Sequence, residues 1–216
     1  MHPAGPLVAL TALQALWGKA ELQADQQLLV YGASGGVGSF AVQIARALGA
    51  HVTAATSGCN RELVERSGAE VVLDHSRDDL TTARDRYDVI FDAVNMLSFR
   101  RMRPALRPSG VMVSVNPFIE KLSPDWLARF RGDRRLRSLF VRPRRADMEQ
   151  RAGWIAAGQV RPLIDKIYPL SEAAAHTYSA SGWVRGKLVL VVDPALAELE
   201  IGAQTEAPVT TSNVAV

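Results

Sequence analysis

The sequence predicts an α/β fold built on a doubly wound parallel sheet, and two observations support this prediction. Short apolar runs alternate, over the first two thirds of the chain, with stretches whose apolar residues recur at helical spacing. Parallel strands are joined by crossovers that usually contain a helix, so this alternation is typical of a parallel sheet with helices on both faces. A glycine-rich turn, residues 32–38, joins the first apolar run to the helical stretch that follows it.

The expected strands are short and are bounded by turn-forming residues. They cover residues 28–32, 51–56, 70–74, 87–92, 111–115 and 136–141. Helical spacing is found over residues 7–17, 40–48, 60–67 and 97–106. Gly49 and Gly68 follow two of these helices, at the position where glycine is favoured because it readily adopts a positive φ. The first helix is expected to end near Gly18, and the last at the turn formed by residues 108–110.

The pattern changes after Pro143. We expect a helix over residues 146–157, a strand over 164–168, a helix over 172–179 that Ser171 caps, and a strand over 187–192. This α+β unit is too short to form a core of its own. The expected organisation is therefore a main domain over residues 1–143, a C-terminal segment over 144–193, and a disordered tail over 194–216, which is rich in Ala, Glu, Thr and Pro.

The heptapeptide Gly-Ala-Ser-Gly-Gly-Val-Gly at residues 32–38 lies between a strand and a helix, which is the layout of a dinucleotide-binding turn. Glycine has no Cβ, so the backbone turns tightly and approaches phosphates closely. The helix that follows presents unpaired N–H groups and the positive end of its dipole to an anionic pyrophosphate. The residues of this turn expected to bind the cofactor are Gly32, Ser34, Gly35, Gly36, Val37 and Gly38.

The end of the second strand predicts which dinucleotide binds. NAD sites usually place Asp or Glu there, where the carboxylate accepts hydrogen bonds from the adenosine ribose. Here residues 56–61 read Thr-Ser-Gly-Cys-Asn-Arg and contain no carboxylate. Ser57 and Asn60 offer hydrogen-bond donors, and the Arg61 guanidinium is suited to a 2′-phosphate. We therefore expect NADP(H) rather than NAD(H), the alternative for Arg61 being a surface arginine in the first turn of a helix.

Two other enzyme classes use a similar glycine turn. Short-chain dehydrogenases need a Tyr-x-x-x-Lys pair, in which the lysine lowers the tyrosine pKa for proton transfer. None of the four tyrosines has a lysine four residues later. A methyltransferase would need an acidic residue after the second strand, and that residue is missing. The sequence fits neither class.

Composition narrows the function classes further. The net charge is only +3, and no run approaches the roughly 18 apolar residues of a membrane span. The N-terminus lacks the basic and apolar regions of an export signal. Cys59 is the single cysteine, which fits a reducing compartment. We therefore expect a cytoplasmic protein without a membrane partner.

The sequence bears on two further partners, a nucleic acid and a metal. Eight arginines lie between Arg129 and Arg145, which indicates either a nucleic-acid contact or a solvated basic surface. We favour the surface, because only four of the 25 basic residues are lysine and arginine is thus the ordinary cation of this chain. One cysteine and four scattered histidines offer no zinc-ligand spacing, so we expect no zinc or other metal.

Several separate motifs occur in an order typical of one enzyme family. They are residues 10–16 (LTALQAL), 30–38 (VYGASGGVG), 68–74 (GAEVVLD) and 181–190 (SGWVRGKLVL). In these motifs the chain resembles the medium-chain dehydrogenases/reductases, and most of all the zinc-free quinone oxidoreductases and related zinc-binding-dehydrogenase-like and alcohol dehydrogenase-like reductases. The resemblance covers about residues 7–193. It implies a Rossmann sheet of about six strands, with the C-terminal segment as a small α+β remnant of a catalytic domain.

The resemblance also implies roles for single residues. Thr11 matches a threonine beside the nicotinamide ring, the alternative being an ordinary threonine inside a helix. Ser57 stands where NAD-specific members carry the ribose-binding aspartate. Val94 matches an apolar residue near the adenosine ribose. Asn95 replaces a usual glycine there, a change that the backbone tolerates because Asn also adopts left-handed angles.

Two more parts of the site are implied in the same way. Ser114, Val115 and Asn116 match the stretch that holds the nicotinamide carboxamide. Lys187 matches a basic residue that reaches the cofactor phosphates, the alternative being a surface lysine at the start of a strand.

The family chemistry is hydride transfer from NADPH to a quinone, enone or aldehyde, in which the nicotinamide carries the reaction and the protein binds and orients. Family members place a barrel-like catalytic domain ahead of the first helix seen here, and we expect this chain to lack it. Two hypotheses follow: an NADPH-dependent oxidoreductase acting on a small carbonyl or quinone substrate, and a non-catalytic NADPH-binding or regulatory module. The sequence identifies no catalytic residue. The family also implies a homodimer, formed through the edge of the sixth strand.

Overall fold

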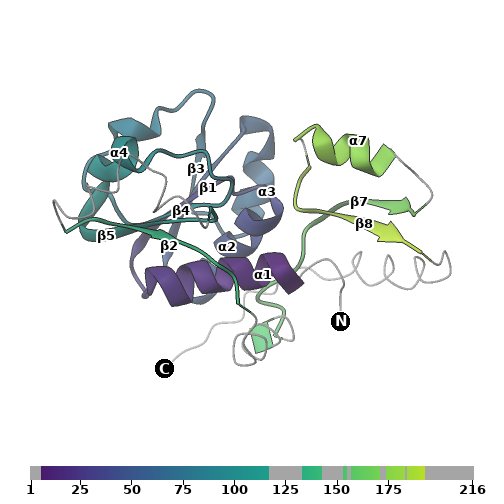
Figure 1. The fold of residues 1–216 in the computed structure, drawn as a ribbon, viewed down its shortest axis with the longest axis horizontal. Helices are drawn as coiled ribbons and strands as arrows, with labels where there is room; N and C mark the ends of the chain where they lie inside the picture. The colour runs from purple at the N-terminus through teal and green to yellow at the C-terminus, as the bar shows by residue number, and fades with distance from the viewer. Residues whose placement is uncertain are drawn as a thin grey trace. The chain divides into compact units, whose positions relative to one another are not determined.

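The computed structural model describes residues 6–116, 133–142, 153–154, 157–170, 174–182 and 184–192 (Figure 1). The chain divides into two compact units. One contains the residues up to Asp165 together with Arg185–Lys187, and the other contains residues 166–184 and those from Leu188 onward. The domain boundary expected at residue 143 separates the main domain from the segment that resembles part of the family's catalytic domain. This boundary stays a prediction.

The first unit contains a six-stranded sheet in the order β3-β2-β1-β4-β5-β6, and all its pairings are parallel. The strands are β1 (Gln27–Tyr31), β2 (His51–Thr56), β3 (Val71–Asp74), β4 (Tyr87–Asp92), β5 (Leu106–Ser114) and β6 (Arg135–Ser138). The chain winds outward from β1 to β3 and then returns to add β4 on the other side of β1. This order confirms the doubly wound α/β fold, and it places the switch point between β1 and β4, where such sheets bind ligands.

Helices cover both faces of this sheet (Figure 1). They are α1 (Pro6–Leu13) with the π-helix η1 (Gln14–Ala20), α2 (Gly36–Ala47), η2 (Gly58–Asn60), α3 (Arg61–Arg66), η3 (Leu80–Thr82), α4 (Phe99–Met102) and η4 (Arg103–Ala105). Successive residues of a strand point to opposite faces. Accordingly Leu28 and Val30 join the apolar cluster beneath α1 and α2, whereas Leu29 joins a second cluster with Phe99 of α4.

The expected strands and helices are largely present, with two differences near the ends of helices. The first helix does not end at Gly18 but continues as η1 to Ala20, because Leu16 and Ala20 are buried and Glu21 adopts the left-handed conformation that ends it. The second begins at Gly36 rather than near residue 40, so the glycine turn itself supplies the first helical turn.

The region expected as the turn 108–110 lies inside β5. Tyr87 pairs with Leu106 and Val89 pairs with Val111, so β5 carries three more residues than β4 between these pairs. The extra residues form a bulge in which Ser109 has a φ of 63°. The expected helix over 97–106 is accordingly shorter, since α4 and η4 end at Ala105.

The sixth strand is also shorter than expected, and it ends at Ser138. The second unit contributes most of a two-stranded sheet, β7 (Ile164–Pro169) with β8 (Lys187–Val191), and the helix α7 (Ala174–Ala180). Most of the helix expected over 146–157 lies outside the described residues, as do Ser171, the expected cap of the helix over 172–179, and the tail beyond Val192. Among the described residues no helix is both long enough and apolar enough to cross a membrane.

Candidate functional site

The glycine turn leaves β1 at the carboxyl edge of the sheet. Gly32 has a φ of +77°, and its N–H donates to the carbonyl of Ala55 at 3.0 Å, which ties the turn to β2. Gly38 lies so close to the start of the turn that a Cβ there would collide with the Gly32 carbonyl oxygen and lie 2.8 Å from Ala33 Cα. Gly38 therefore allows α2 to pack directly on the turn, as a dinucleotide-binding turn requires.

The start of α2 is open to an anion. Gly35 precedes the helix in an extended conformation, and the N–H of Ser39 makes a 2.9 Å hydrogen bond to the Gly35 carbonyl. The N–H groups of Gly36, Val37 and Gly38 precede that bond, and the first N–H groups of a helix have no partner within it. These groups and the helix dipole together favour a phosphate at this end.

The segment around Lys187 lies against this turn although it is distant in sequence. The Gly186 N–H donates to the Ser34 carbonyl at 2.8 Å, and Gly35 and Gly186 form a parallel bridge. A Cβ at Gly36 would lie 3.0 Å from Lys187 Cδ. The aliphatic part of Lys187 thus covers Gly36, which brings a cation to the first turn of α2, the neighbourhood that the resemblance implied.

The loop after β2 carries a hydrogen-bonded group of polar side chains. Asn60 Nδ2 donates to Ser57 Oγ at 3.0 Å and to Ser34 Oγ at 3.1 Å, while Thr56 Oγ1 donates to Ser34 Oγ at 2.8 Å. Both amide hydrogens of Asn60 are thus directed to the two serines. Asn60 Oδ1 is buried without a hydrogen-bond partner, so the network retains one unused acceptor. The arrangement links the glycine turn to the position expected to select the cofactor.

Two charged residues flank this network. Arg61, the expected partner of a 2′-phosphate, lies in the first turn of α3 with its guanidinium 3.5 Å from the Glu65 carboxylate. Asp74, at the end of β3, approaches Gly58 so closely that a Cβ there would lie 2.6 Å from Asp74 Oδ2. Hydrogen bonds from Ser76 hold the pKa of Asp74 below its ordinary value. A carboxylate therefore lies next to this loop, contributed by the neighbouring strand.

Sequence reasoning missed Asp74 because it considered only residues that follow β2 in the chain. The available signal was the parallel order of the strands, in which Thr56 pairs with Asp74 at the shared carboxyl edge.

The loop after β4 forms the other side of the switch point. Asp92 is fully buried, and its carboxylate accepts hydrogen bonds from the backbone N–H groups of Leu97 at 2.8 Å, Val94 at 3.2 Å and Met96 at 3.3 Å. Burial raises the pKa of Asp92, and these N–H groups oppose that rise. Val94 packs on the glycine turn, since a Cβ at Gly32 would lie 2.7 Å from Val94 Cγ1.

The residues expected near the carboxamide lie beside this loop. Asn95 has a φ of 58°, the left-handed conformation expected for a residue that replaces glycine. Ser114, fully buried at the end of β5, donates to Asn95 Oδ1 at 3.4 Å and accepts from the Asn116 N–H at 3.3 Å. The Val115 N–H donates to the Asp92 carbonyl at 3.3 Å. The end of β5 and the β4 loop are therefore joined.

Thr11 is an interior residue of α1. Its side chain is 9% exposed, and its hydroxyl donates to the Leu7 carbonyl at 2.7 Å, one helical turn earlier. This bond is common for a threonine inside a helix. The nicotinamide role of Thr11 stays a prediction.

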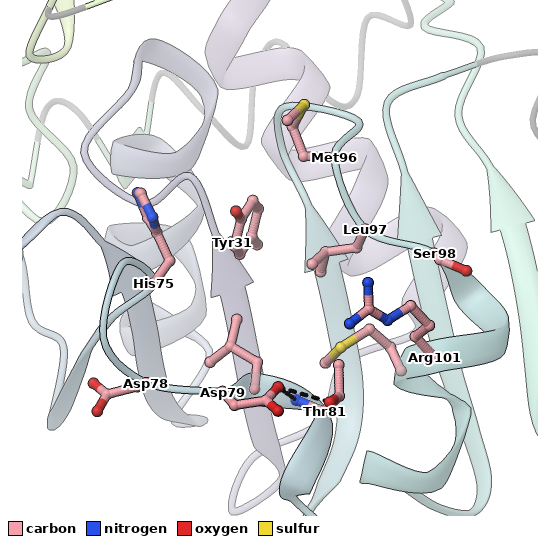
Figure 2. A pocket seen from close by; sticks show the side chains of 11 residues that line it. Tyr31, His75, Asp78, Asp79, Thr81, Met96, Leu97, Ser98 and Arg101 are labelled. Carbon is pink, nitrogen blue, oxygen red and sulfur yellow. Dashed lines mark hydrogen bonds between the residues drawn. The ribbon is translucent and has the colours of Figure 1, made fainter.

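A cavity of about 310 Å³ opens beside these loops (Figure 2). Tyr31 from the end of β1, His75 from the residue after β3 and Leu97 from the β4 loop line it, and Thr81 and Arg101 add polar atoms. The rings of Tyr31 and His75 lie 5.7 Å apart. Burial, and to a lesser extent the nearby Asp92, raises the pKa of Tyr31, so its hydroxyl stays neutral at pH 7. This cavity brings together residues that sequence reasoning did not single out.

The described residues do not form a zinc site. Among them no group of three or more His, Cys, Asp or Glu side chains is placed to hold a metal ion. Cys59 is exposed, and His51 pairs with Glu70 at 2.9 Å.

Comparison with known proteins identifies the family of this chain. Residues 67–190, more than half of the chain, match the family model for zinc-binding dehydrogenases. The chain belongs to the zinc-binding dehydrogenase family. The resemblance to the medium-chain dehydrogenases/reductases is thereby confirmed.

Relatives within the family carry oxidoreductase names. The chain is 31% identical over 196 residues to the chloroplast envelope quinone oxidoreductase homolog of Arabidopsis thaliana, which covers 86% of this chain and 60% of that protein. It is 27% identical to the NADPH-dependent alkenal/one oxidoreductase of the same plant, over 88% of this chain and 46% of that protein. The chain thus spans about half to three fifths of the length of these relatives.

Solved structures agree on the fold. The quinone oxidoreductase from Coxiella burnetii superimposes with a TM-score of 0.77 at 28% identity, and the match covers 88% of this chain and 60% of that one. A six-stranded Rossmann sheet is therefore the fold of this family member, as the sequence predicted.

Proposed function

We propose that this protein is an NADPH-dependent oxidoreductase that reduces a small quinone, enone or aldehyde. The observation that carries the proposal is the start of α2, where Gly38 leaves no room for a side chain and the first three N–H groups have no partner within the helix. When bound, the nicotinamide would supply the hydride, and the substrate carbonyl or alkene would accept it. The chain's own residues hold and orient the two ends of the cofactor.

The pyrophosphate is assigned to the glycine turn and the start of α2. The N–H groups of Gly36, Val37 and Gly38 would donate to its oxygens, and Lys187, whose stem covers Gly36, would add a positive charge. The joined ends of β4 and β5, with Ser114 and Val115, are assigned to the carboxamide side.

The cavity next to Tyr31 is assigned to the adenine ring. Its volume of about 310 Å³ lies at the small end of the roughly 300–1,000 Å³ typical of ligand pockets. The partly buried ring of Tyr31 and the Leu97 side chain offer apolar surface, and Arg101 offers hydrogen-bond donors, while the Thr81 hydroxyl donates to Asp79 Oδ1 at 2.6 Å. The cavity lies at the carboxyl ends of β1, β3 and β4, where open α/β sheets bind nucleotides.

The preference for NADPH over NADH rests on the loop after β2. The Ser57 hydroxyl accepts from Asn60 and lies 3.5 Å from Cys59 Sγ, a weak hydrogen-bond partner that a phosphate oxygen would replace. Arg61 lies four residues further along, and its ion pair with Glu65 is exposed, so it costs little to exchange for a phosphate partner. Asp74 acts against this preference, because a carboxylate repels a 2′-phosphate and accepts from a ribose hydroxyl instead.

The test is a pair of measurements on the full chain. Calorimetric titration with NADPH and NADH should show binding of both, with the tighter constant for NADPH. Absorbance at the nicotinamide band should then show NADPH consumption with a quinone or an enone. Absence of NADPH binding would refute the proposal.

A second candidate is a non-catalytic NADPH-binding module. The residues assigned above all hold the cofactor and none is assigned to the substrate, so the same site would also serve such a module. NADPH binding without turnover on either substrate would support this candidate over the first.

A further inference from the structure

We propose that Asp92 is a positioning residue for the cofactor, whose carboxylate holds the β4 loop in the shape that binding requires. The inference rests on the proposed function, because it concerns the same NADPH site. It adds a residue that contacts no cofactor atom and acts through the loop.

Asp92 accepts hydrogen bonds from the backbone of the loop that follows it. It ends β4, it is fully buried, and its two carboxylate oxygens accept from three backbone N–H groups within the next five residues. Oδ1 accepts from the N–H groups of Val94 and Met96, and Oδ2 accepts from the N–H group of Leu97 at 2.8 Å. The loop reverses direction within this span, and the carboxylate takes the place that water would occupy around an exposed loop.

The residues of this loop face three parts of the site. Val94 packs on Gly32, so it supports the glycine turn from the side of β4. Asn95 lies in the left-handed conformation and receives the Ser114 hydroxyl. Met96 and Leu97 line the cavity assigned to the adenine (Figure 2). One carboxylate therefore fixes the loop whose residues face the proposed pyrophosphate, carboxamide and adenine positions.

A carboxylate suits this position better than its amide. Burying a charge is costly, and burial raises the pKa of Asp92, so a group kept only for packing would gain by being neutral. Hydrogen bonds to an ionised acceptor are stronger than neutral ones, and a carboxylate accepts with both oxygens. An amide at the same place accepts with one oxygen only, and its NH₂ group would face an N–H group of the loop.

The strand itself supplies a matched control. Asp88 lies on the same strand β4 at the opposite edge of the sheet, where it accepts from the Gln27 N–H at 2.8 Å and from Arg107 at 2.8 Å. Asp88→Asn and Asp92→Asn make the same chemical change on one strand. Only the second alters a loop that lines the proposed site.

The experiment measures NADPH affinity by calorimetry for the full chain and both variants, with thermal unfolding alongside. Asp92→Asn should raise the Kd roughly tenfold or more, about the effect of one lost hydrogen bond to a charged group. Asp88→Asn should lower thermal stability and leave the Kd within about twofold. Equal affinities for wild type and Asp92→Asn would overturn the inference.

Hydrogen exchange on the unaltered protein gives a second readout that does not depend on how the variant folds. The amide hydrogens of Val94, Met96 and Leu97 should be protected before any cofactor is added, because the carboxylate already holds them. Fast exchange of these amides without NADPH, followed by protection with it, would show that the cofactor orders the loop and would also overturn the inference. Absence of NADPH binding to the wild type would instead refute the proposed function.

Discussion

At the scale of single residues, the site depends on where side chains are missing as much as on where they are present. Gly38 and Gly32 occupy positions where a Cβ would meet backbone or the Val94 side chain. Polar residues form a hydrogen-bonded network, in which Asn60 Nδ2 donates to the hydroxyls of Ser57 and Ser34. Spacing alone predicted the glycines, because a strand–turn–helix layout requires them. The partners of Asn60 follow from the fold, which brings two loops together.

Gly38→Ala should weaken NADPH binding and lower the free energy of unfolding. The added methyl group would collide with the Gly32 carbonyl oxygen, and α2 would have to move away from the turn to relieve this clash. Overpacking of this kind costs about 1–3 kcal/mol. Urea unfolding and cofactor titration measure the two effects. Gly18→Ala is the control: a Cβ at Gly18 meets nothing within 4 Å, and the change should be neutral or stabilising by up to about 1 kcal/mol.

Ser57→Asp should shift the cofactor preference toward NADH. A carboxylate at this position repels a 2′-phosphate and accepts from the ribose hydroxyls of NADH. We expect the ratio of the two dissociation constants to move by about tenfold or more, equivalent to about 1.4 kcal/mol. Ser109→Asp adds the same charge in the β5 bulge, where the residue is exposed, and should leave the ratio unchanged. An unchanged ratio in Ser57→Asp would remove Ser57 from the phosphate site.

At the scale of elements, the sequence predicted strands more accurately than helix ends. β2 and β4 have the expected bounds, because each is rich in residues that favour strands and is buried on both faces along nearly its whole length. The start of β5 was not predicted, since Arg107, Pro108 and Ser109 form a bulge whose place is set by pairing with β4. The cavity was not predicted either, because η3, α4 and the loops after β1, β3 and β4 meet only in the folded sheet.

Thr81→Trp tests the adenine assignment. Thr81 lines the cavity from η3, so an indole there should fill part of its volume and weaken binding of 2′,5′-ADP by about tenfold. Thr82→Trp is the matched control, because Thr82 is exposed, lies next in the same short helix and, like Thr81, gives up one hydrogen bond to Asp79. Calorimetry with 2′,5′-ADP measures both. Equal binding by the two variants would place the adenine elsewhere.

At the scale of the whole molecule, the chain combines a Rossmann sheet that carries the candidate site with a second compact unit built from β7, β8 and α7. The site assembled here lies within the first unit, which includes Gly186 and Lys187 from late in the sequence. Ligand binding should therefore stabilise that unit. We also propose, from the family resemblance, that two copies associate along the edge strand β6.

Saturating NADP⁺ should raise the unfolding temperature of the first unit. A ligand that binds only the folded state at 100 times its Kd contributes about 2.7 kcal/mol. For a chain of this length each kcal/mol corresponds to about 2–4 °C. Scanning calorimetry with increasing NADP⁺ measures the shift, and adenosine without phosphate at equal concentration is the control. A transition that stays in place at high NADP⁺ would contradict the cofactor assignment.

The sequence by itself determined the class of fold, the glycine turn and the family, because periodic burial and a Cβ-free turn are local properties of the chain. The tertiary structure decided which residues share the site. Asp74 approaches Gly58, Lys187 covers Gly36, and Asp92 holds the loop that supports Gly32. These contacts join segments that are distant in sequence or depend on loop conformation. Parallel strand order, which places all the carboxyl ends at one edge, brings Asp74 and Asp92 to this region, and the bridge between Gly35 and Gly186 brings Lys187 there. The glycine turn therefore indicates what kind of ligand binds, and its neighbours in space determine how that ligand is held.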